Sequence, residues 1–547
     1  MFRFLVPMTL LLACKGDTDD TDDTDDTDDT GDTGVEADTT CADLGLPEIP
    51  FSDEAPAAFQ RWQPAGDFSA PLRDGTTWTL SESWTGCETY IFLPHWWPIS
   101  TLDDTSYWFS GVDELLERSP ANVHYFFAYG GSSADEAESY GAQMQTDIDE
   151  TLAALSEDDR AWWMDRLHVV DGPSDTVEGL VGDMFGRDIS RFGWAVDRAQ
   201  RIRTTGYFPA VEAYNTTLNN NGEWPWEFRL YSAAAEAEYF NFEATRQEAL
   251  DAVDATVVEI FGGDIIEEYE DGTVTLPDAT TMAGFDTLEI DVLMECPDKD
   301  LYEISNCGAW DYLAYLWLYD DDTKSYVEMG RFITTYHRES RWVVDASHAL
   351  AWLKEGGERS VRYQWAPSWN TQPTGVTVQL RLSNQGKGMA PDEIVPLFSG
   401  GTVSTTYNDD RPPVAVEIPA DAAKVEIVSI ATGHGADTYT CAEFCNHSHH
   451  FTISETTWDQ AFTEAGTESG CADSVGTGTV PNQAGTWWFG RGGWCPGRRV
   501  DPFVVDVTDQ VTLGGPAEVS YEAKINGGAL VDSAGTFEMR SWMVIYR

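Results

Sequence analysis

The chain is poor in basic residues: its 547 residues include 32 Lys and Arg against 94 Asp and Glu, a formal net charge of −62. Nucleic-acid binding needs basic surface that attracts phosphates, so this balance argues against a nucleic-acid partner. It also argues against docking on anionic lipid through a basic patch. The sequence lacks an apolar run of about 18 residues, so it predicts no membrane-spanning helix.

Cysteine is sparse, and no two cysteines have the C-x-x-C spacing of dithiol redox sites or structural zinc sites. If Cys14 is set apart as a lipidation site, eight remain, an even number typical of an oxidising compartment. Eight cysteines allow on the order of a hundred pairings. Pairing of neighbours suggests Cys296 with Cys307, Cys441 with Cys445 and Cys471 with Cys495, which leaves Cys41 with Cys87.

The first 14 residues, MFRFLVPMTLLLAC, have the composition of an export signal. Arg3 supplies the positive charge and residues 4–12 the short apolar core. Leu-Leu-Ala directly before Cys14 resembles the bacterial lipobox, in which the cysteine becomes the lipidated first residue. Residues 1–14 are therefore expected to be a lipoprotein signal peptide, with an ordinary signal peptide as the alternative. This predicts a secreted lipoprotein of the bacterial outer membrane or cell surface, held to the membrane by its lipid anchor only.

An acidic segment over residues 15–40 follows. Ten of the eighteen residues from Asp17 to Gly34 are Asp. The segment has nothing apolar to bury and its charges repel one another, so we expect a disordered tether. Calcium binding is the alternative, but the repeat lacks the spaced Gly and closing Glu of a calcium loop.

Residues 41–255 are expected to form an α/β domain. Apolar runs at 89–93, 123–129 and 167–170 alternate with helical patterns, and Ser133 begins a capping box. Strand, helix, strand in this order favours a parallel sheet. Residues 84–87 (WTGC) and 192–198 (FGWAVDR) resemble parts of the thioredoxin-type fold. Without a C-x-x-C we expect Cys87 to be disulfide-bonded to Cys41, with a reactive thiol as the alternative.

From residue 262 onward the pattern changes to β-strands. Leu288, Ile290, Val292 and Met294 alternate with other residues, as on a strand with one buried face. Many short strands with Gly, Pro, Asn and Asp turns favour antiparallel sandwiches. About 285 residues exceed one ordinary sandwich of roughly 100 residues. We therefore expect two, over 262–398 and 399–547, joined near SGGTVSTT at 399–406.

Five motifs in this half occur in one order with characteristic spacing. They are Glu295-Cys296-Pro297, Trp310-Asp311-Tyr312, Met329–Thr334 (MGRFIT), Cys441–Cys445 (CAEFC) and Arg491–Gly497 (RGGWCPG). Together they resemble the peptide-N-glycosidase F family from Gly272 almost to the C-terminus, about half of the chain. The resemblance implies two eight-stranded antiparallel jelly rolls with the active site between them. The six cysteines from Cys296 onward stand where the family has three disulfides.

The resemblance also implies an enzyme, a hydrolase that removes N-glycans from glycoproteins or glycopeptides. Family members cleave the amide between an asparagine side chain and the first N-acetylglucosamine, and need no metal or cofactor. We expect the chain to act as a monomer. The alternative is a catalytically inactive surface lipoprotein that binds glycan or protein.

Two acids carry the expected chemistry. Amide hydrolysis needs a positioned water and groups that accept and donate protons, and carboxylates serve when their pKa values differ. Asp311 lies four residues after Cys307, and Glu443 is the central residue of Cys441-x-x-x-Cys445. A crosslink beside each acid would hold it in place. The resemblance implies that Asp311 transfers the proton and Glu443 orients water or sugar; structural, hydrogen-bonded acids are the alternative.

The sequence departs from the family in two places. Where the family has a third glutamate this chain has YQWAPSW at 363–369, and Gln364 is the nearest match. Where a well-known member has Arg after the catalytic Asp, this chain has Tyr312. Arg491 does match the family's basic residue, which is expected to bind the sugar or a carboxylate. We expect substrate contacts from Arg491, Gln364, Trp365, Tyr312 and Trp494. Ring stacking is also considered for Trp369, Trp487 and Trp488, with burial in the core as the alternative.

Histidines follow the Cys441–Cys445 motif. His447 and His449 share a face if they lie on a strand, and two imidazoles so placed can bind copper or zinc. The alternative, which we favour for these two and for His434 and His450, is a structural or solvated role. No metal site is predicted.

Overall fold

The structure is a computed structural model that describes residues 40–95, 106–187, 192–211, 227–321, 323–435, 441–532 and 534–547. The predicted signal peptide, Cys14 and nearly all of the acidic tether lie outside these residues. Thr40–Arg547 form one compact unit. Within the described ranges, none of the helices combines the length and the apolar composition that a membrane crossing requires.

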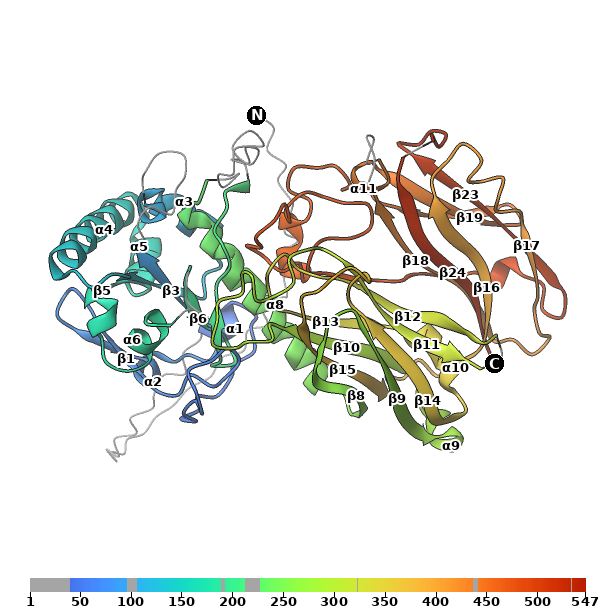
Figure 1. Ribbon diagram of the computed structural model, residues 1–547, viewed down its shortest axis with the longest axis horizontal. Coiled ribbons are helices and arrows are strands. Elements are labelled where there is room, and N and C mark those ends of the chain that lie inside the picture. Colours follow the sequence, from blue (N-terminus) through green and yellow to red (C-terminus); the bar gives the residue numbers. More distant parts are fainter. Residues whose placement is uncertain are drawn as a thin grey trace, which may run out of the picture. The chain divides into compact units, whose positions relative to one another are not determined.

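The first region is an α/β layer built on a five-stranded sheet of order β5-β4-β3-β6-β7 (Figure 1). Strands β3, β4 and β5 run parallel, as the alternation of strands and helices predicts, and β6 and β7 are antiparallel additions. The strands are β3 Thr89–His95, β4 Val123–Tyr129, β5 Leu167–Pro173, β6 Trp194–Val196 and β7 Ile202–Thr204. The helices that accompany them are α3 Val112–Arg118, α4 Ala134–Ala154, α5 Glu157–Met164, α6 Leu180–Phe185 and α8 Ala234–Asp251.

Local sequence signals account for the helix starts and the burial of this sheet. The Ser133 side chain accepts from the Glu136 N–H at the start of α4, and Ser156 does the same for α5. Every residue of β3 and β4 is buried, because helices or loops cover both faces of the sheet. The thioredoxin-type assignment stays a prediction. Cys87 precedes β3 and forms a buried disulfide with Cys41, so it presents no free thiol.

The first antiparallel sandwich packs sheet β13-β10-β15-β8 against sheet β21-β12-β11-β14-β9. The alternation at 288–294 lies on β10, whose apolar side chains enter the core between the sheets. The strands are β8 Ala255–Ile266, β9 Tyr269–Asp278, β10 Thr287–Glu295, β11 Leu313–Asp320, β12 Ser325–Ile333, β13 Ser340–Asp345, β14 Gly356–Gln364 and β15 Thr374–Ser383. The short strand β21 (Arg499–Val500) comes from the other sandwich's part of the chain.

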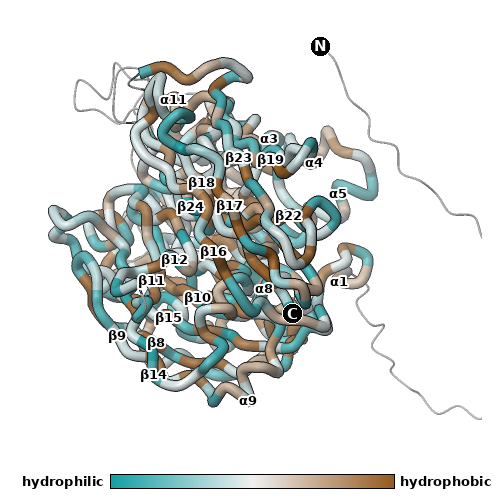
Figure 2. The backbone as a smooth tube through the Cα atoms, turned by 90° about the vertical axis from the view of Figure 1, so that its right-hand side faces the viewer, coloured by the Kyte–Doolittle hydropathy of each residue, from teal (hydrophilic) through white to brown (hydrophobic). Residues whose placement is uncertain are grey.

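The second antiparallel sandwich packs sheet β16-β24-β18-β22 against sheet β17-β23-β19-β20. Its strands are β16 Pro391–Thr402, β17 Val414–Glu417, β18 Lys424–His434, β19 His447–Ile453, β20 Thr456–Ala461, β22 Phe503–Asp506, β23 Pro516–Ile525 and β24 Thr536–Tyr546. Brown, hydrophobic stretches follow several of these strands in Figure 2. Two antiparallel sandwiches are thus confirmed.

The domain boundaries differ from those expected. The predicted join at 399 falls inside β16, which pairs with β24 from Pro391 to Thr402. The first sandwich begins at Ala255, not at residue 262, because β8 pairs with β15 from that residue. Gly400 and Gly401 therefore lie within a strand, at a shift in its register with β24, and do not link two domains. The remaining short elements are α1 Thr40–Asp43, β1 Ser69–Pro71, β2 Thr77–Thr79, α2 Leu80–Ser83, α9 Ala279–Met282, α10 Leu350–Leu353 and α11 Cys441–Phe444.

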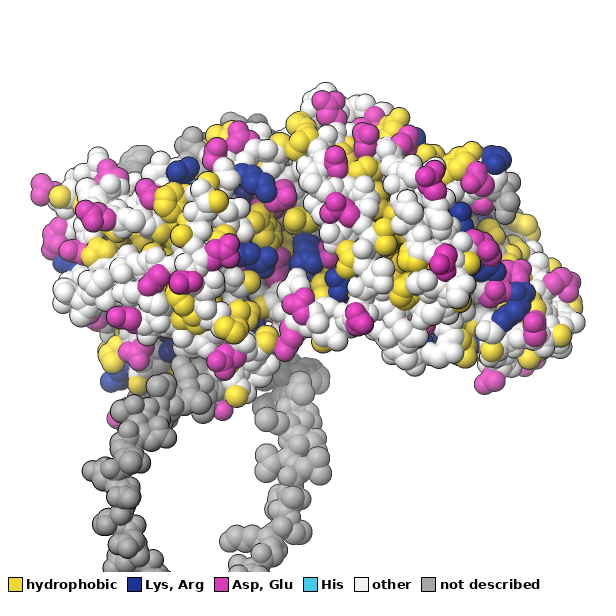
Figure 3. All heavy atoms as spheres, turned by 90° about the horizontal axis from the view of Figure 1, so that it is seen from below, with side chains coloured by type: hydrophobic (Ala, Val, Ile, Leu, Met, Phe, Trp, Pro, Cys, Tyr) yellow, Lys and Arg dark blue, Asp and Glu magenta, His cyan; other side chains and the backbone are white. Residues whose placement is uncertain are grey.

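The two sandwiches are joined by a polar clamp and by backbone pairing. The buried Arg331 of β12 pairs with Glu328 at 2.8 Å and donates to the Thr432 hydroxyl of β18 at 2.8 Å. Strand β21 pairs with β12, and the Trp342 indole donates to the Gly497 carbonyl at 2.9 Å. These contacts hold together the edges that carry the candidate site. Acidic side chains are dispersed over the face seen in Figure 3.

Candidate active site

Asp311 and Glu443 lie on either side of one arginine. Arg491 Nη2 is 3.7 Å from Asp311 Oδ2, and Arg491 Nε is 3.2 Å from Glu443 Oε1. The Arg491 side chain is 1% exposed, whereas those of Asp311 and Glu443 are 18% and 15% exposed. One acid comes from each sandwich, and both remain open to solvent. The structure therefore brings together the two acids and the arginine that the sequence singles out.

Asp311 lies two residues before β11 and is held by residues that follow β12. The Thr334 hydroxyl donates to the Trp310 carbonyl at 2.6 Å and accepts from the Tyr312 N–H at 2.7 Å. The Tyr336 hydroxyl donates to Asp311 Oδ2 at 2.5 Å. Backbone and side chain of the aspartate are thus both positioned by residues 334–336. The sequence analysis does not identify Tyr336. No local motif points to it, because Tyr336 lies 25 positions from Asp311 in the sequence.

Glu443 sits in the short helix α11, closed by the Cys441–Cys445 disulfide. Its Oε2 accepts from the Gly435 N–H at 3.1 Å, and its carbonyl accepts from the Gly492 N–H at 2.7 Å. The crosslink and these bonds fasten the glutamate to the segments on both sides. This is the bracing that the Cys-x-x-x-Cys spacing predicts.

Burial raises the pKa of both acids above their ordinary values. The positive charge of Arg491 opposes that rise in each case. The Tyr336 hydrogen bond also lowers the pKa of Asp311, whereas the charge of Asp311 raises that of Glu443. Carboxyls whose pKa values are raised toward neutrality suit proton transfer.

Arg491 is fully engaged by the protein. Its Nη1 donates to the Phe489 carbonyl at 3.0 Å and its Nη2 to the Thr486 carbonyl at 2.9 Å. Its guanidinium lies 4.9 Å from the ring centre of Trp494. With each guanidinium nitrogen partnered and almost no exposed surface, Arg491 holds the two acids in place and offers little to a sugar.

Exposed aromatic rings lie next to Asp311 in the sequence or contact its neighbour Tyr312. Trp310 is 56% exposed and Trp369 is 68% exposed, and Tyr312 meets Trp369 edge to face at 5.4 Å between ring centres. Exposed apolar side chains that adjoin one another can mark a ligand-binding surface. Trp310 was missed by the sequence reasoning, although its place directly before Asp311 is a usable signal.

Two predicted substrate contacts are corrected by the structure. Trp365 is fully buried, lies over Gly308 and donates to the Ile266 carbonyl at 3.0 Å. Trp494 is buried, donates to the Gly433 carbonyl at 2.7 Å and stacks on His434. Neither presents a ring face to a sugar, because each ring fills a core. Trp487 and Trp488 are buried as well.

Gln364 ends β14 and belongs to a different hollow. Its Oε1 accepts from the Trp317 indole at 3.3 Å. Together with Trp317, Arg362, Arg540 and others it lines a groove of about 410 Å³. No contact among the described residues joins Gln364 to Asp311, Glu443 or Arg491.

The histidines of β19 are structural. His447 and His449 are buried, and Nδ1 of the first lies 3.1 Å from Nε2 of the second. His449 Nδ1 also lies 2.6 Å from the Tyr521 hydroxyl. Burial lowers the pKa of His447 to about 3 and that of His449 well below its ordinary value. Burial likewise lowers the pKa of His434 to about 3. His450 faces outward and lies 2.5 Å from Asp459.

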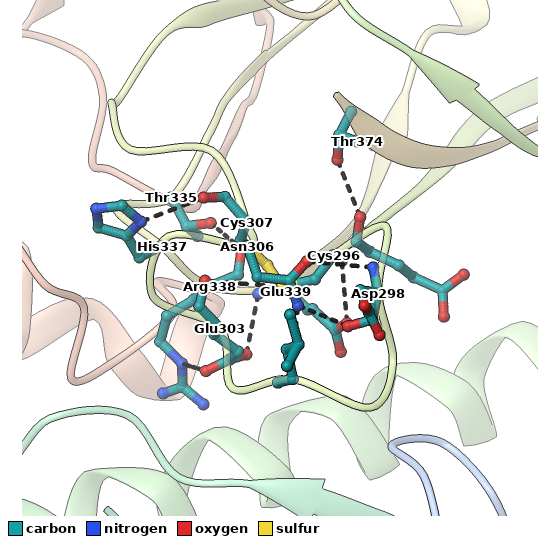
Figure 4. The surroundings of a disulfide bond; sticks show 12 residues. Cys296, Asp298, Glu303, Asn306, Cys307, Thr335, His337, Arg338, Glu339 and Thr374 are labelled. Atoms are coloured by element: carbon teal, nitrogen blue, oxygen red, sulfur yellow. Dashed lines mark hydrogen bonds and ion pairs between the residues drawn. A yellow bond between two sulfur atoms is a disulfide. The ribbon is translucent and has the colours of Figure 1, made fainter. Parts of the chain in front are cut away.

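Four disulfides link the described cysteines in the pairs that their spacing suggests: Cys41–Cys87, Cys296–Cys307, Cys441–Cys445 and Cys471–Cys495. Glu339 lies near enough to Cys296 and Cys307 to form a three-residue group of metal-ligand type (Figure 4). The two sulfurs are bonded to each other, and Glu339 accepts from the Cys296 N–H and from Arg61, each at 3.0 Å. These contacts give the group a structural role.

Comparisons with known proteins find similarity to about half of the chain. Residues 402–544 match the family model "Peptide-N-glycosidase F, C terminal". The chain is 26% identical over 297 residues to peptide-N(4)-(N-acetyl-beta-D-glucosaminyl)asparagine amidase F of Elizabethkingia miricola. The aligned residues cover 48% of this chain and 73% of that protein. Among solved structures, recombinant PNGase F is 18% identical, with 53% of this chain and 95% of that one covered and a TM-score of 0.44. PNGF-II is 13% identical, with 55% and 67% covered and a TM-score of 0.41.

Proposed function

Because its second half is peptide-N-glycosidase F-like, we propose that this chain hydrolyses the amide between an asparagine side chain and the first N-acetylglucosamine of an N-glycan. The products would be an aspartate in the polypeptide and a glycosylamine. The observation that carries the proposal is the placement of Asp311 and Glu443 on one buried arginine, with both acidic side chains partly exposed.

Asp311 is the proposed proton-transfer residue. Both of its described side-chain partners, Tyr336 and Arg491, lie at Oδ2, which leaves Oδ1 for water or for the leaving nitrogen. Burial raises its pKa, so it can accept a proton from the attacking water and return one to the departing amine. Amide hydrolysis needs both transfers, and one carboxyl held in place can serve them in turn.

Glu443 is proposed to orient the water or the first sugar. Its carboxylate is tied to Arg491 and to the Gly435 N–H, so its direction is set before substrate arrives. Because its pKa is raised in part by the charge of Asp311, the two acids resist being ionised together.

The exposed rings beside Asp311 are the proposed sugar contacts. Trp310 and Trp369 present large apolar faces to solvent, and Tyr312 bridges toward Trp369. Aromatic rings of this kind can pack against the apolar faces of sugars. Tyr312 thus acts through its ring, where a well-known family member has an arginine.

We also propose that the enzyme works outside the cytoplasm, tethered by a lipid at Cys14. The disulfides among the described cysteines suit an oxidising compartment. An anchored enzyme on an acidic tether would meet glycoproteins at the cell surface.

The test is release of glycan from a denatured N-glycosylated protein by the purified chain. Mass spectrometry should show the glycosylated asparagine converted to aspartate. Asp311→Asn should abolish the conversion, whereas Asp321→Asn, at an exposed aspartate that pairs with the exposed Lys324 at 3.3 Å, should not.

A second candidate is a surface protein that binds glycan without cleaving it. The amide of Gln364, where the family has a third glutamate, favours it. Glycan binding without release by the wild-type chain would support this candidate and overturn the amidase.

A further inference from the structure

A buried glutamate of the first region ties together three segments next to the candidate site. Glu236 of α8 is fully buried. Its Oε1 accepts from Arg338 Nη1 at 2.8 Å, from Asn482 Nδ2 at 2.9 Å and from the Gly206 N–H at 2.9 Å. In Figure 1, α8 lies between the α/β layer and the sandwiches. One carboxylate oxygen therefore joins the first region to a segment of each sandwich's sequence.

Arg338 is the centre of this junction. It also donates to Glu303 Oε2 at 3.1 Å, to the Pro481 carbonyl at 2.8 Å and to the Thr204 carbonyl at 2.9 Å. Figure 4 shows Arg338 and Glu303 beside the Cys296–Cys307 disulfide. A buried guanidinium with this many partners has one permitted position, and removal of a charged partner would be strongly disruptive.

Both segments held by Glu236 lead directly to Tyr336. Tyr336 is two residues before Arg338, and its N–H donates to Gln483 Oε1 at 2.9 Å. Its carbonyl accepts from the Ala484 N–H at 3.1 Å. Gly485 packs on the Tyr336 ring so closely that an added Cβ would lie 2.3 Å from the ring. Residues 482–485 and Arg338 therefore clamp the tyrosine whose hydroxyl binds Asp311.

We propose that Glu236 is a positioning residue, through which the first region holds the Tyr336 hydroxyl on Asp311 by way of Arg338 and Asn482. The expected change in kcat rests on the proposed function. The expected change in the Tyr336–Asp311 hydrogen bond rests only on the described contacts. It gives the α/β region a role in the amidase that the two sandwiches cannot supply themselves.

The expected signature is a change at Asp311. The charged or titratable groups that face it are Arg491, Tyr336, Glu443 and Tyr312. Of these, Tyr336 is the one that Glu236 positions. Its hydrogen bond lowers the pKa of Asp311, so a loosened Tyr336 lets that pKa rise.

The test compares Glu236→Gln with Glu243→Gln in the full chain. Glu243 is also buried on α8 and pairs with Arg203 at 2.6 Å and Arg246 at 3.4 Å, both in the first region. Glu236→Gln should lower kcat roughly 10- to 100-fold with little change in KM, and move the acidic limb of the pH–rate profile to higher pH. Glu243→Gln should lower stability and leave kcat and the position of the acidic limb unchanged. Equal kinetic effects of the two variants would overturn the proposal.

A second measurement does not depend on turnover. With 3-fluorotyrosine at position 336, the ¹⁹F resonance reports the titration of Asp311. Its midpoint should rise in Glu236→Gln and stay in place in Glu243→Gln; an unmoved midpoint in Glu236→Gln would overturn the proposal even if the chain cleaves no glycan. Should Glu236→Gln not fold, Asn482→Ala tests the same path. It removes the amide that donates to Glu236 Oε1 and to the Ser232 carbonyl, each at 2.9 Å.

Discussion

The Tyr336 hydroxyl donates a 2.5 Å hydrogen bond to Oδ2 of Asp311. This bond and the nearby Arg491 charge counter the effect of burial on the aspartate. The balance sets the pH at which Asp311 ionises, and so the pH range in which it can accept a proton.

Replacing Tyr336 with Phe removes this bond and keeps the ring. The pKa of Asp311 should then rise, because the bond lowers it in the wild type. An Asp311 that must be ionised to accept a proton would lose activity at a higher pH than before, so the acidic limb of kcat/KM should move upward. Tyr326→Phe is the control, since its hydroxyl donates to Asp271 at 3.1 Å. An identical profile for wild type and Tyr336→Phe would contradict the expectation.

Replacing Arg491 with Met leaves two carboxylates without their shared cation. Their pKa values, already raised by burial, should rise further because Arg491 lowers both. A carboxyl whose pKa is higher in the folded protein than in the unfolded chain lowers the free energy of unfolding as pH rises. The variant should be destabilised by about 3 kcal/mol near neutral pH and by less near the unfolded carboxyl pKa of about 4.

Urea unfolding of the Arg491 variant at several pH values measures this effect. Arg499→Met, at a partly exposed arginine paired with Asp501 at 2.6 Å, should change stability by no more than about 1 kcal/mol. A loss of stability for Arg491→Met that does not depend on pH would show that the carboxylates do not titrate as described.

Removing the Cys441–Cys445 disulfide by a double Ser substitution should affect activity more than stability. The crosslink spans four residues, so it restricts the unfolded chain only slightly, yet it closes the helix that carries Glu443. The Cys41–Cys87 double Ser variant is the converse: its longer loop predicts a stability loss of about 4 kcal/mol with unchanged kcat. Thermal unfolding and glycan release on both variants test the pair, and a reversed outcome would refute the bracing role of the shorter crosslink.

Trp369→Ala should weaken substrate binding without altering the chemical step. Loss of one ring contact of about 1 kcal/mol corresponds to a several-fold rise in KM, with kcat nearly constant. The KM of Trp369→Phe should lie between the KM of the wild type and that of Trp369→Ala. A fall in kcat at unchanged KM would place Trp369 outside the sugar-binding surface.

Local patterns were sufficient for much of the fold. Alternation at 288–294 predicts β10, and Ser133 with Glu136 predicts the start of α4, because both depend on residues within a few positions of each other. Strand pairing across β16 and β24 was not predictable locally, so the join was placed within a strand.

The candidate acids and Arg491 were evident from the motifs, but the contacts that position these acids were not. Arg491 reaches Glu443 across 48 positions, and Arg338 reaches Glu236 across 102. The burial of Trp365 and Trp494, against the exposure of Trp310 and Trp369, likewise depends on what packs above each ring. The sequence by itself determined strands such as β10 and the three crosslinks between nearby cysteines, and its motifs singled out the two acids, because each of these depends on residues close together along the chain. Only the tertiary structure decided that Arg491 lies between the two acids and that Tyr336 binds Asp311, because these contacts form where distant segments are packed together.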